Sequence, residues 1–270
     1  MPDVPYVLGH SRAELRRLML QAAILRPITA RLLREAGLTP GMRVLDLGCG
    51  SADVAMLAAE LVAPNGAVVG IDRSAEALAV ARERATAGYA NIEFRESAAE
   101  DFVDQAPFDL AIGRYVLVHQ GNPPAFIRSA ASHVRRGGVI AFHEIGIYGE
   151  CQAFPPVALW QQAWSWIAAG LRSVMVHPDA GGRMIAHFHD AGLKQPTMLC
   201  EIPVGGGPDS PIYAWMALTL RSLLPQVEKI GAATAAEIDI DTLEDRLRNA
   251  VTAVHGEALC PLQFCGWTKL

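Results

Sequence analysis

The chain has 270 residues, of which 51% are hydrophobic and 19% charged, and its formal net charge is −5. This size and composition predict a soluble globular protein with one sizeable core, built as one elaborated domain or as a domain with a subdomain. No run of Lys and Arg stands out anywhere, which disfavours a nucleic-acid partner.

Targeting and cysteine patterns are consistent with a protein of the cytoplasm. Charges interrupt any apolar segment near the start of the chain, and no uncharged stretch reaches the ~18 residues of a membrane span. The five cysteines form no CxxC pair, so we expect reduced, mostly structural thiols.

The first part of the chain has a helical pattern. Apolar residues recur at helical spacing after Ser11, Pro27 is expected to break this helix, and a second helix is predicted up to Ala36. Pro40 and Gly41 form a turn, after which the apolar run 44–47 is typical of a buried parallel strand.

From this strand to residue 144, predicted strands and helices alternate, which indicates a parallel sheet covered on both faces. The strands are expected at 44–47, 67–71, 92–95, 109–113 and 139–144, and the helices at 54–62, 75–87 and 124–134.

Beyond Gly146 the alternation stops. A long helical stretch at 154–175 contains three tryptophans and is interpreted as an inserted lid. A helix at 182–191, a strand at 197–202, a glycine-rich loop at 205–208, further helices and a last strand at 262–267 are expected to follow.

The segment 46–53, Asp-Leu-Gly-Cys-Gly-Ser-Ala-Asp, lies where the first buried strand turns into a helix. At this place an open α/β sheet presents backbone N–H groups to a ligand, and glycines allow close approach. Asp72 ends the second strand, where a carboxylate accepts hydrogen bonds from ribose hydroxyls. The alternative is a tight turn that binds no ligand.

Two acids decide which nucleotide is favoured. Asp53 occupies the sixth position of the dinucleotide pattern, where Gly or Ala is expected, and Asp46 precedes the first glycine. Two carboxylates repel a pyrophosphate and suit a ligand with an ammonium and a sulfonium, so S-adenosylmethionine is favoured over NAD.

The segment Val44–Gly50 resembles the first motif of class I S-adenosylmethionine-dependent methyltransferases, and further segments across residues 40–145 are similar to the menaquinone and ubiquinone methyltransferase-like superfamily. They are 70–74, 98–102, 108–111, 117–119 and 136–139. The resemblance implies a doubly wound, mostly parallel seven-stranded Rossmann-like sheet. It also implies S-adenosylmethionine as cofactor and S-adenosylhomocysteine as product. The expected segments are a helical extension (1–40), the cofactor-binding core (41–150) and a helical lid with the closing strands (151–270).

The resemblance also implies a set of cofactor-binding residues: Asp46, Gly48, Cys49, Gly50, Asp53, Asp72, Arg73, Ala98, Ala99, Glu100, Gly113, Arg114 and Tyr115. Two positions depart from the family pattern. Ala52 stands where a third glycine is usual, and Ala98 stands where the family often has an Asp for the adenine amino group. The backbone of Ala99 or the side chain of Glu100 is expected to substitute for that Asp.

Methyl transfer is an in-line displacement that depends mainly on holding the nucleophile close to the methyl group in a dry site. Where a general base is used, it must reach the acceptor's proton. The catalytic candidates after the fourth and fifth strands are His143, Glu144, His119 and Tyr115. For Arg114 the alternative is pairing with Asp109 or a surface acid.

The candidate substrate-binding residues are His119, His143, Trp160, Trp164 and His177. Each has a packing alternative, and for the two tryptophans, one helical turn apart, core packing is favoured. We expect no metal, because His187 and His189 face different sides of a helix.

The sequence therefore predicts an S-adenosylmethionine-dependent methyltransferase acting on an O, N or C atom of a small, partly apolar molecule. The alternative is a protein that binds the cofactor without methyl transfer, such as a cyclase or a regulatory binder. The expected partner is the small-molecule substrate, and a homodimer is left open.

Overall fold

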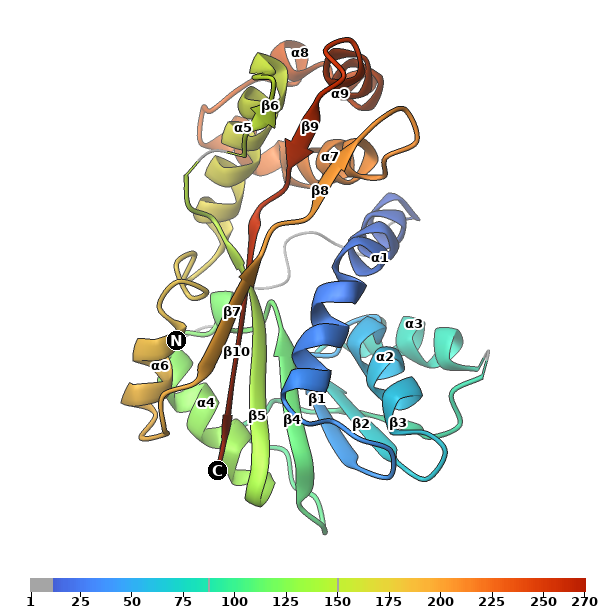
Figure 1. Cartoon of the computed structure of the whole chain (residues 1–270), viewed down its shortest axis with the longest axis vertical. Helices are drawn as coiled ribbons and strands as arrows, with labels where there is room; N and C mark the ends of the chain where they lie inside the picture. Colours follow the sequence, from blue (N-terminus) through green and yellow to red (C-terminus); the bar gives the residue numbers. More distant parts are fainter. Residues whose placement is uncertain (1–11, 87, 150) are drawn as a thin grey trace. The chain divides into compact units, whose positions relative to one another are not determined.

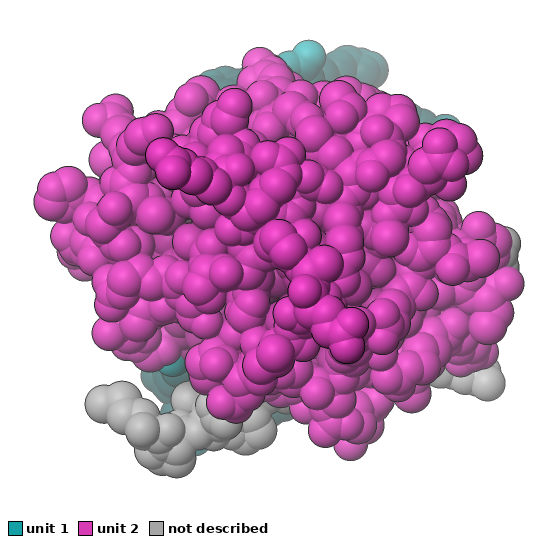
Figure 2. Space-filling view, turned by 90° about the horizontal axis from the view of Figure 1, so that it is seen from below, with its two compact units in different colours: residues 1–25, 147–178, 202–262 teal, residues 26–146, 179–201, 263–270 magenta. Residues whose placement is uncertain are grey.

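The computed structural model describes residues 12–86, 88–149 and 151–270. By its internal packing the chain divides into two compact units, which Figure 2 colours separately. Unit 1 comprises residues 1–25, 147–178 and 202–262, and unit 2 comprises residues 26–146, 179–201 and 263–270. Both units combine segments that lie far apart in the sequence. The division into three consecutive segments that we expect from the sequence (1–40, 41–150 and 151–270) stays a prediction.

Unit 2 is built on a seven-stranded sheet of order β3-β2-β1-β4-β5-β10-β7, which confirms the predicted mostly parallel Rossmann-like sheet (Figure 1). Strands β1 to β5 pair in parallel, and β10 pairs antiparallel with β7. The strands are β1 (Arg43–Leu47), β2 (Ala67–Asp72), β3 (Ile92–Glu96), β4 (Phe108–Arg114), β5 (Val134–Gly146), β7 (Thr197–Glu201) and β10 (Leu262–Lys269).

Helices cover both faces of this sheet, with α2 and α3 on one side and α4 and α6 on the other (Figure 1). They are α2 (Asp53–Val62), α3 (Ala75–Ala85), α4 (Pro123–Ser132) and α6 (Met184–Asp190), with a 3₁₀ helix η1 (Leu117–His119) after β4. The Ser74 hydroxyl caps α3 by accepting from the Ala77 N–H, and Asn122 caps α4 through the Ala125 N–H. These caps set where the helices begin after the strands and loops that precede them.

Unit 1 contains α5 (Ala158–Val174), α7 (Ile212–Lys229), α8 (Ala235–Ile238) and α9 (Leu243–Thr252). It also has a three-stranded antiparallel sheet of order β6-β9-β8, formed by β6 (Ala153–Phe154), β9 (Glu257–Leu259) and β8 (Val204–Gly206). Two predictions are wrong here. Residue 154 lies in a strand and not in the long helix, and the glycine-rich loop is partly strand because Gly205 and Gly206 pair with β9.

The helix α1 (Arg12–Glu35) is continuous, so the predicted break at Pro27 is wrong. Apolar side chains on both sides of the proline, Leu25 and Ile28, are buried, and their packing outweighs the lost hydrogen bond. Ser11, after which the helical pattern was expected to begin, lies outside the described residues. None of the helices in the described residues has the length and apolarity needed to cross a membrane.

Replacement of the exposed Pro27 by alanine should raise the free energy of unfolding by about 1 kcal/mol, because alanine restores a helical N–H donor. Urea unfolding followed by circular dichroism measures this change. The exposed control Arg34→Lys in the same helix should have no effect, and destabilisation by Pro27→Ala would contradict the interpretation.

Candidate functional site

The glycine loop joins β1 to α2 in unit 2, as the sequence predicts. Gly48, Gly50 and Ala52 all adopt positive φ angles of 64°, 51° and 71°. A Cβ atom at Gly50 would point into open space, so this part of the loop can be approached closely by a ligand. The Cys49 N–H donates to the Ile71 carbonyl at 2.9 Å, which ties the loop to the end of β2.

Asp72 ends β2 with both carboxylate oxygens aligned by backbone donors. The Gly50 N–H donates to Oδ2 at 2.8 Å and the Ser74 N–H donates to Oδ1 at 2.9 Å. Each oxygen keeps a further lone pair, and the side chain is half-buried. A pre-aligned carboxylate beside a glycine loop can therefore accept hydrogen bonds from the hydroxyls of a ligand.

Asp46 is the most deeply buried acid of the loop, with 1% of its surface exposed. Burial raises the pKa of its carboxyl group to about 8, against the opposing effect of the Arg114 guanidinium. Its Oδ2 has no hydrogen-bond partner within the described part of the chain. A buried acid with an unsatisfied oxygen is suited to a cationic or hydrogen-bond-donating ligand group.

The charge of Asp53 is compensated by arginines, which the sequence did not predict. Its Oδ1 accepts from Arg84 Nη2 at 2.6 Å, and its Oδ2 lies 3.8 Å from Arg114 Nη2. The alternative pairing of Arg114 with Asp109 is not the one formed, because Asp109 accepts from Arg135 Nε at 2.6 Å. The argument that Asp53 repels a pyrophosphate is therefore weaker than the sequence suggested.

The segment predicted to border the adenine follows β3. Two donors from the α4 region, Ser129 Oγ and His133 Nε2, each lie 3.1 Å from the carbonyl oxygen of Ala99. Arg73 and Glu100, both predicted cofactor contacts, form an exposed ion pair. Ala98 is half-buried, and the assignment of Ala98, Ala99 and Glu100 to adenine recognition, like that of Arg73 to cofactor binding, stays a prediction.

A tight turn follows β4 and lies beside the glycine loop. Leu47 of β1 pairs with Gly113 of β4, and a Cβ atom at either Gly113 or Gly48 would lie within 2.7 Å of a Val116 methyl group. Tyr115 adopts a left-handed φ of 59°. The backbone of a residue other than glycine is strained in this conformation. Such strain persists only where the surrounding structure enforces it.

The backbone of this turn is held by Glu144 of β5. The Val116 and Leu117 N–H groups donate to Glu144 Oε1 at 2.9 and 2.8 Å. The carboxyl group is fully buried, which raises its pKa to about 8, although the N–H groups it accepts from lower the pKa in part. The geometry shows Glu144 binding backbone groups, and its predicted catalytic role stays a prediction.

The neighbouring His143 is also fully buried. Its Nδ1 lies 3.0 Å from Thr29 Oγ1, and its Nε2 lies 3.0 Å from Gln263 Oε1. Burial, together with the positive charge of Arg114, lowers the pKa of the imidazole to about 3, so it is neutral at physiological pH. Both ring nitrogens are engaged within unit 2, and roles as base or substrate contact stay predictions.

Thr29 and Gln263 were missed by the sequence reasoning. Thr29 lies on α1 and Gln263 on β10, and both are fully buried. They lie 114 and 120 residues from His143 in the chain, so no local motif could reveal them. His119, by contrast, is the exposed last residue of η1, as expected for a side chain just after the fourth strand.

The other substrate candidates belong to unit 1. Trp160 and Trp164 are buried on α5, and their indole N–H groups donate to the carbonyls of Leu259 at 3.0 Å and Gly149 at 3.2 Å. His177 is half-buried in the segment after α5. The two tryptophans thus have hydrogen-bond partners within unit 1, and their roles in substrate binding stay predictions.

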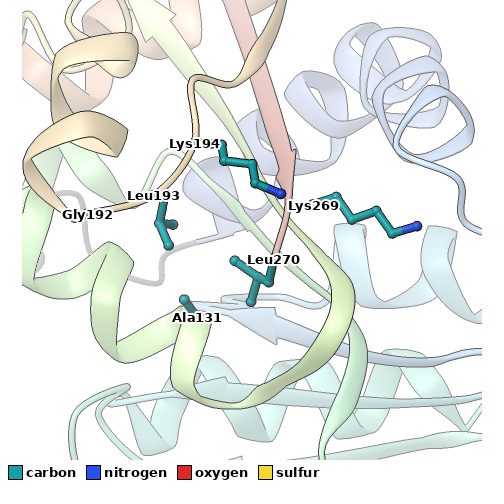
Figure 3. Close-up of a pocket in the computed structure, with 6 residues that line it drawn as sticks. All are labelled: Ala131, Gly192, Leu193, Lys194, Lys269 and Leu270. Atoms are coloured by element: carbon teal, nitrogen blue, oxygen red, sulfur yellow. The ribbon is translucent and has the colours of Figure 1, made fainter.

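A pocket of about 380 Å³ lies elsewhere in unit 2 (Figure 3). Its lining residues are Ala131, Gly192, Leu193, Lys194, Lys269 and Leu270. Leu270 exchanges backbone hydrogen bonds with Gly137 and Gly138 near the start of β5, whereas His143 and Glu144 lie near its end. The pocket therefore lies near the start of β5, whereas the glycine loop lies at the carboxyl end of β1.

Within residues 12–86, 88–149 and 151–270, no group of three or more His, Cys, Asp and Glu side chains could hold a metal ion. His187 is buried on α6, while His189 is exposed and pairs with Asp190.

Residues 38–176 match a family described as a methyltransferase domain. This match spans more than half of the chain, and the chain belongs to that methyltransferase domain family. The methyltransferase class that the family resemblance of residues 40–145 implied is confirmed.

Curated relatives are similar over the same part of the chain. A ubiquinone biosynthesis O-methyltransferase from Glaesserella parasuis is 36% identical over 107 residues, which are 37% of this chain and 44% of the relative. A 2-phytyl-1,4-naphtoquinone methyltransferase from Synechocystis sp. is 34% identical over 43% of this chain and 52% of the relative. An arsenite methyltransferase from Aquipseudomonas alcaligenes is 30% identical over 42% and 40%. The chain thus spans about half the length of the curated relatives it matches.

Solved structures support the fold. A candidate methyltransferase from Bacillus halodurans C-125 superposes with a TM-score of 0.57 at 15% identity, covering 89% of this chain and 97% of that protein. The YcgJ protein from Bacillus subtilis gives a TM-score of 0.52 at 15% identity, covering 90% and 98%. At these identities the likeness concerns the fold alone.

Glu144→Gln should reduce the pH dependence of stability. Since the carboxyl pKa is raised from its ordinary 4.5 to about 8 by folding, ionisation favours the unfolded chain. The stability from this group is complete below pH 4.5 and is lost as the pH rises toward 8. Gln keeps an oxygen acceptor, so the difference in unfolding free energy between pH 5 and pH 8.5 should shrink by at least about 1 kcal/mol.

Urea unfolding at the two pH values measures this difference, with the exposed Glu83→Gln as control. An equal pH dependence in Glu144→Gln and the wild-type protein would contradict the assigned role of burial.

Gly113→Ala should destabilise the turn after β4, because its Cβ atom would lie 2.5 Å from Val116 Cγ2. We expect a loss of about 1–3 kcal/mol in unfolding free energy. The double variant Gly113→Ala, Val116→Ala removes the clash and should be more stable than the sum of the two single changes predicts. Additive effects in this cycle, measured by thermal unfolding, would show that the two side chains do not meet.

Proposed function

We propose that the chain is an S-adenosylmethionine-dependent methyltransferase that transfers a methyl group to an O, N or C atom of a small, partly apolar molecule. The observation that carries this proposal is the alignment of Asp72 by the Gly50 and Ser74 N–H groups beside an open glycine loop. Membership of the methyltransferase domain family supports it, and so do the relatives' names, which favour transfer over cofactor binding alone.

The residues of the loop fit this cofactor. Asp72 would accept hydrogen bonds from the ribose hydroxyls of the cofactor. The loop at Gly48 and Gly50, with its positive φ angles, would lie against the amino-acid part of the cofactor. The unsatisfied Oδ2 of the buried Asp46 is an acceptor for an ammonium group. Arg114, close to both Asp46 and Asp53, adds a donor for a carboxylate.

When bound, the cofactor supplies an electrophilic methyl group on a sulfonium. The protein's own residues would position and shield the site: Glu144 fixes the turn after β4, and Tyr115 stands on that turn. Burial raises the pKa of the Tyr115 phenol, which keeps it neutral. Catalysis of methyl transfer needs mainly proximity of the reacting groups and exclusion of water. A rigid turn beside the loop would serve both needs at the cofactor.

Calorimetric titration with S-adenosylhomocysteine tests the cofactor assignment. The wild-type protein should bind it with micromolar affinity, and Asp72→Ala should raise the dissociation constant at least about tenfold, because charge-assisted hydrogen bonds are lost. Asp209→Ala, an exposed acid of a loop in unit 1, is the matched control and should bind as the wild-type protein does. No binding by the wild-type protein would refute the proposal.

A positive titration would be followed by an acceptor screen that measures S-adenosylhomocysteine release from S-adenosylmethionine. Phenols, amines, activated carbon acids and arsenite cover the acceptor chemistry of the relatives and of the three atom types. Absence of S-adenosylhomocysteine release with every acceptor, despite cofactor binding, would instead favour a binder or a cyclase.

We further propose that the chain acts in the cytoplasm and that its partner is the small-molecule substrate and not nucleic acid, while a homodimer is left open. The acidic net charge of −5 supports the exclusion of nucleic acid. Sedimentation analysis with and without DNA tests the oligomeric state and this exclusion.

A further inference from the structure

Gln263 provides one acceptor atom for two side chains of the candidate site. It is fully buried on β10, and its Oε1 lies 2.6 Å from the Tyr115 hydroxyl and 3.0 Å from His143 Nε2. An amide oxygen only accepts hydrogen bonds, so the Tyr115 O–H and the His143 Nε2–H must both donate to it.

This arrangement fixes which ring nitrogen of His143 carries the hydrogen. With its hydrogen on Nε2, neutral His143 has an accepting Nδ1, and the Thr29 hydroxyl must donate to it across 3.0 Å. The Thr29 oxygen in turn accepts from Arg114 Nη1 at 3.4 Å. The hydrogen bonds therefore run in one direction from Arg114 through Thr29 and His143 to the amide oxygen.

The same logic orients the Tyr115 phenol. Its hydrogen is committed to Gln263, so toward any other group its oxygen can only accept. The Tyr115 ring meets the His143 ring edge to face, with centroids 5.9 Å apart and planes at 76°. Tyr115 directly follows β4, and β4 pairs with β1, the strand that leads into the glycine loop, so the residue that carries this acceptor belongs to the turn beside that loop.

We propose that Gln263 is a positioning residue of this site: it sets the hydrogens of His143 and Tyr115 so that the phenolic oxygen is an acceptor for a cationic ligand group held by the glycine loop. The part that concerns the ligand rests on the proposed function. The assignment of the hydrogens rests on geometry alone, so the two parts can fail separately.

The hydrogen assignment is tested by long-range ¹H–¹⁵N correlation spectra of the full chain labelled with ¹⁵N-histidine. His143, identified by the signal that His143→Gln lacks, should be a single neutral Nε2–H tautomer in the wild-type protein. Gln263→Met, similar in volume but without the acceptor, should lose this tautomer preference. Thr268→Val, a buried polar change on the same strand, is the control and should retain it.

The ligand part is tested by calorimetry with S-adenosylhomocysteine and with sinefungin, which carries an ammonium group in place of the methyl sulfonium. Gln263→Met should weaken sinefungin roughly threefold to tenfold, the range of one neutral hydrogen bond, and S-adenosylhomocysteine by less than about twofold. Tyr115→Phe, which removes the oxygen itself, should show the same selective loss even where Gln263→Met fails to fold.

An Nδ1–H or doubly protonated His143 in the wild-type protein would overturn the proposal, as would equal losses for both ligands in Gln263→Met and Tyr115→Phe. A wild-type protein with the Nε2–H tautomer that binds neither ligand would uphold the hydrogen assignment and refute the proposed function.

Discussion

The candidate site depends on one buried contact, the Glu144 carboxyl group that accepts the Val116 and Leu117 N–H groups. The chain leaves β4 beside the glycine loop and must turn there without a sheet partner for these donors. Unsatisfied, they would each cost on the order of 1–3 kcal/mol. A single carboxyl group satisfies both, and the glycines at 48 and 113 leave the room that Val116 then occupies.

The two ends of β5 therefore serve different purposes. Near its start the strand pairs with the last residue of the chain, while near its end two consecutive side chains, His143 and Glu144, point to opposite faces and stabilise the same turn. Sequence reasoning took both for catalytic candidates, since titratable residues at strand ends are typical of active sites. Both side chains are fully buried and bind other parts of the protein, so each has a structural role whether or not it takes part in the reaction.

Much of the sheet could be predicted because hydrophobic runs and glycine turns are local signals, and the strands from 43 to 146 follow them closely. The continuous α1 could not be predicted, since the burial that outweighs Pro27 is a tertiary effect. The strands β6, β8 and β9 have two or three residues each, too short for any periodicity. In the site, the acids and glycines could be found because they belong to local motifs. Gln263 and Thr29 could not, because each is recognised only by its hydrogen bond to His143, which is distant in the sequence.

The raised pKa of Asp46 couples ligand binding to protons. With a pKa of about 8, the carboxyl group is mostly protonated at neutral pH in the free protein. A cationic group placed beside it favours the carboxylate, so binding would expel a proton into the solvent. The measured binding enthalpy would then vary with the ionisation enthalpy of the buffer, and the apparent affinity for a cationic ligand would increase with pH up to about 8. Proton release on binding would thus distinguish a cationic ligand from a neutral one.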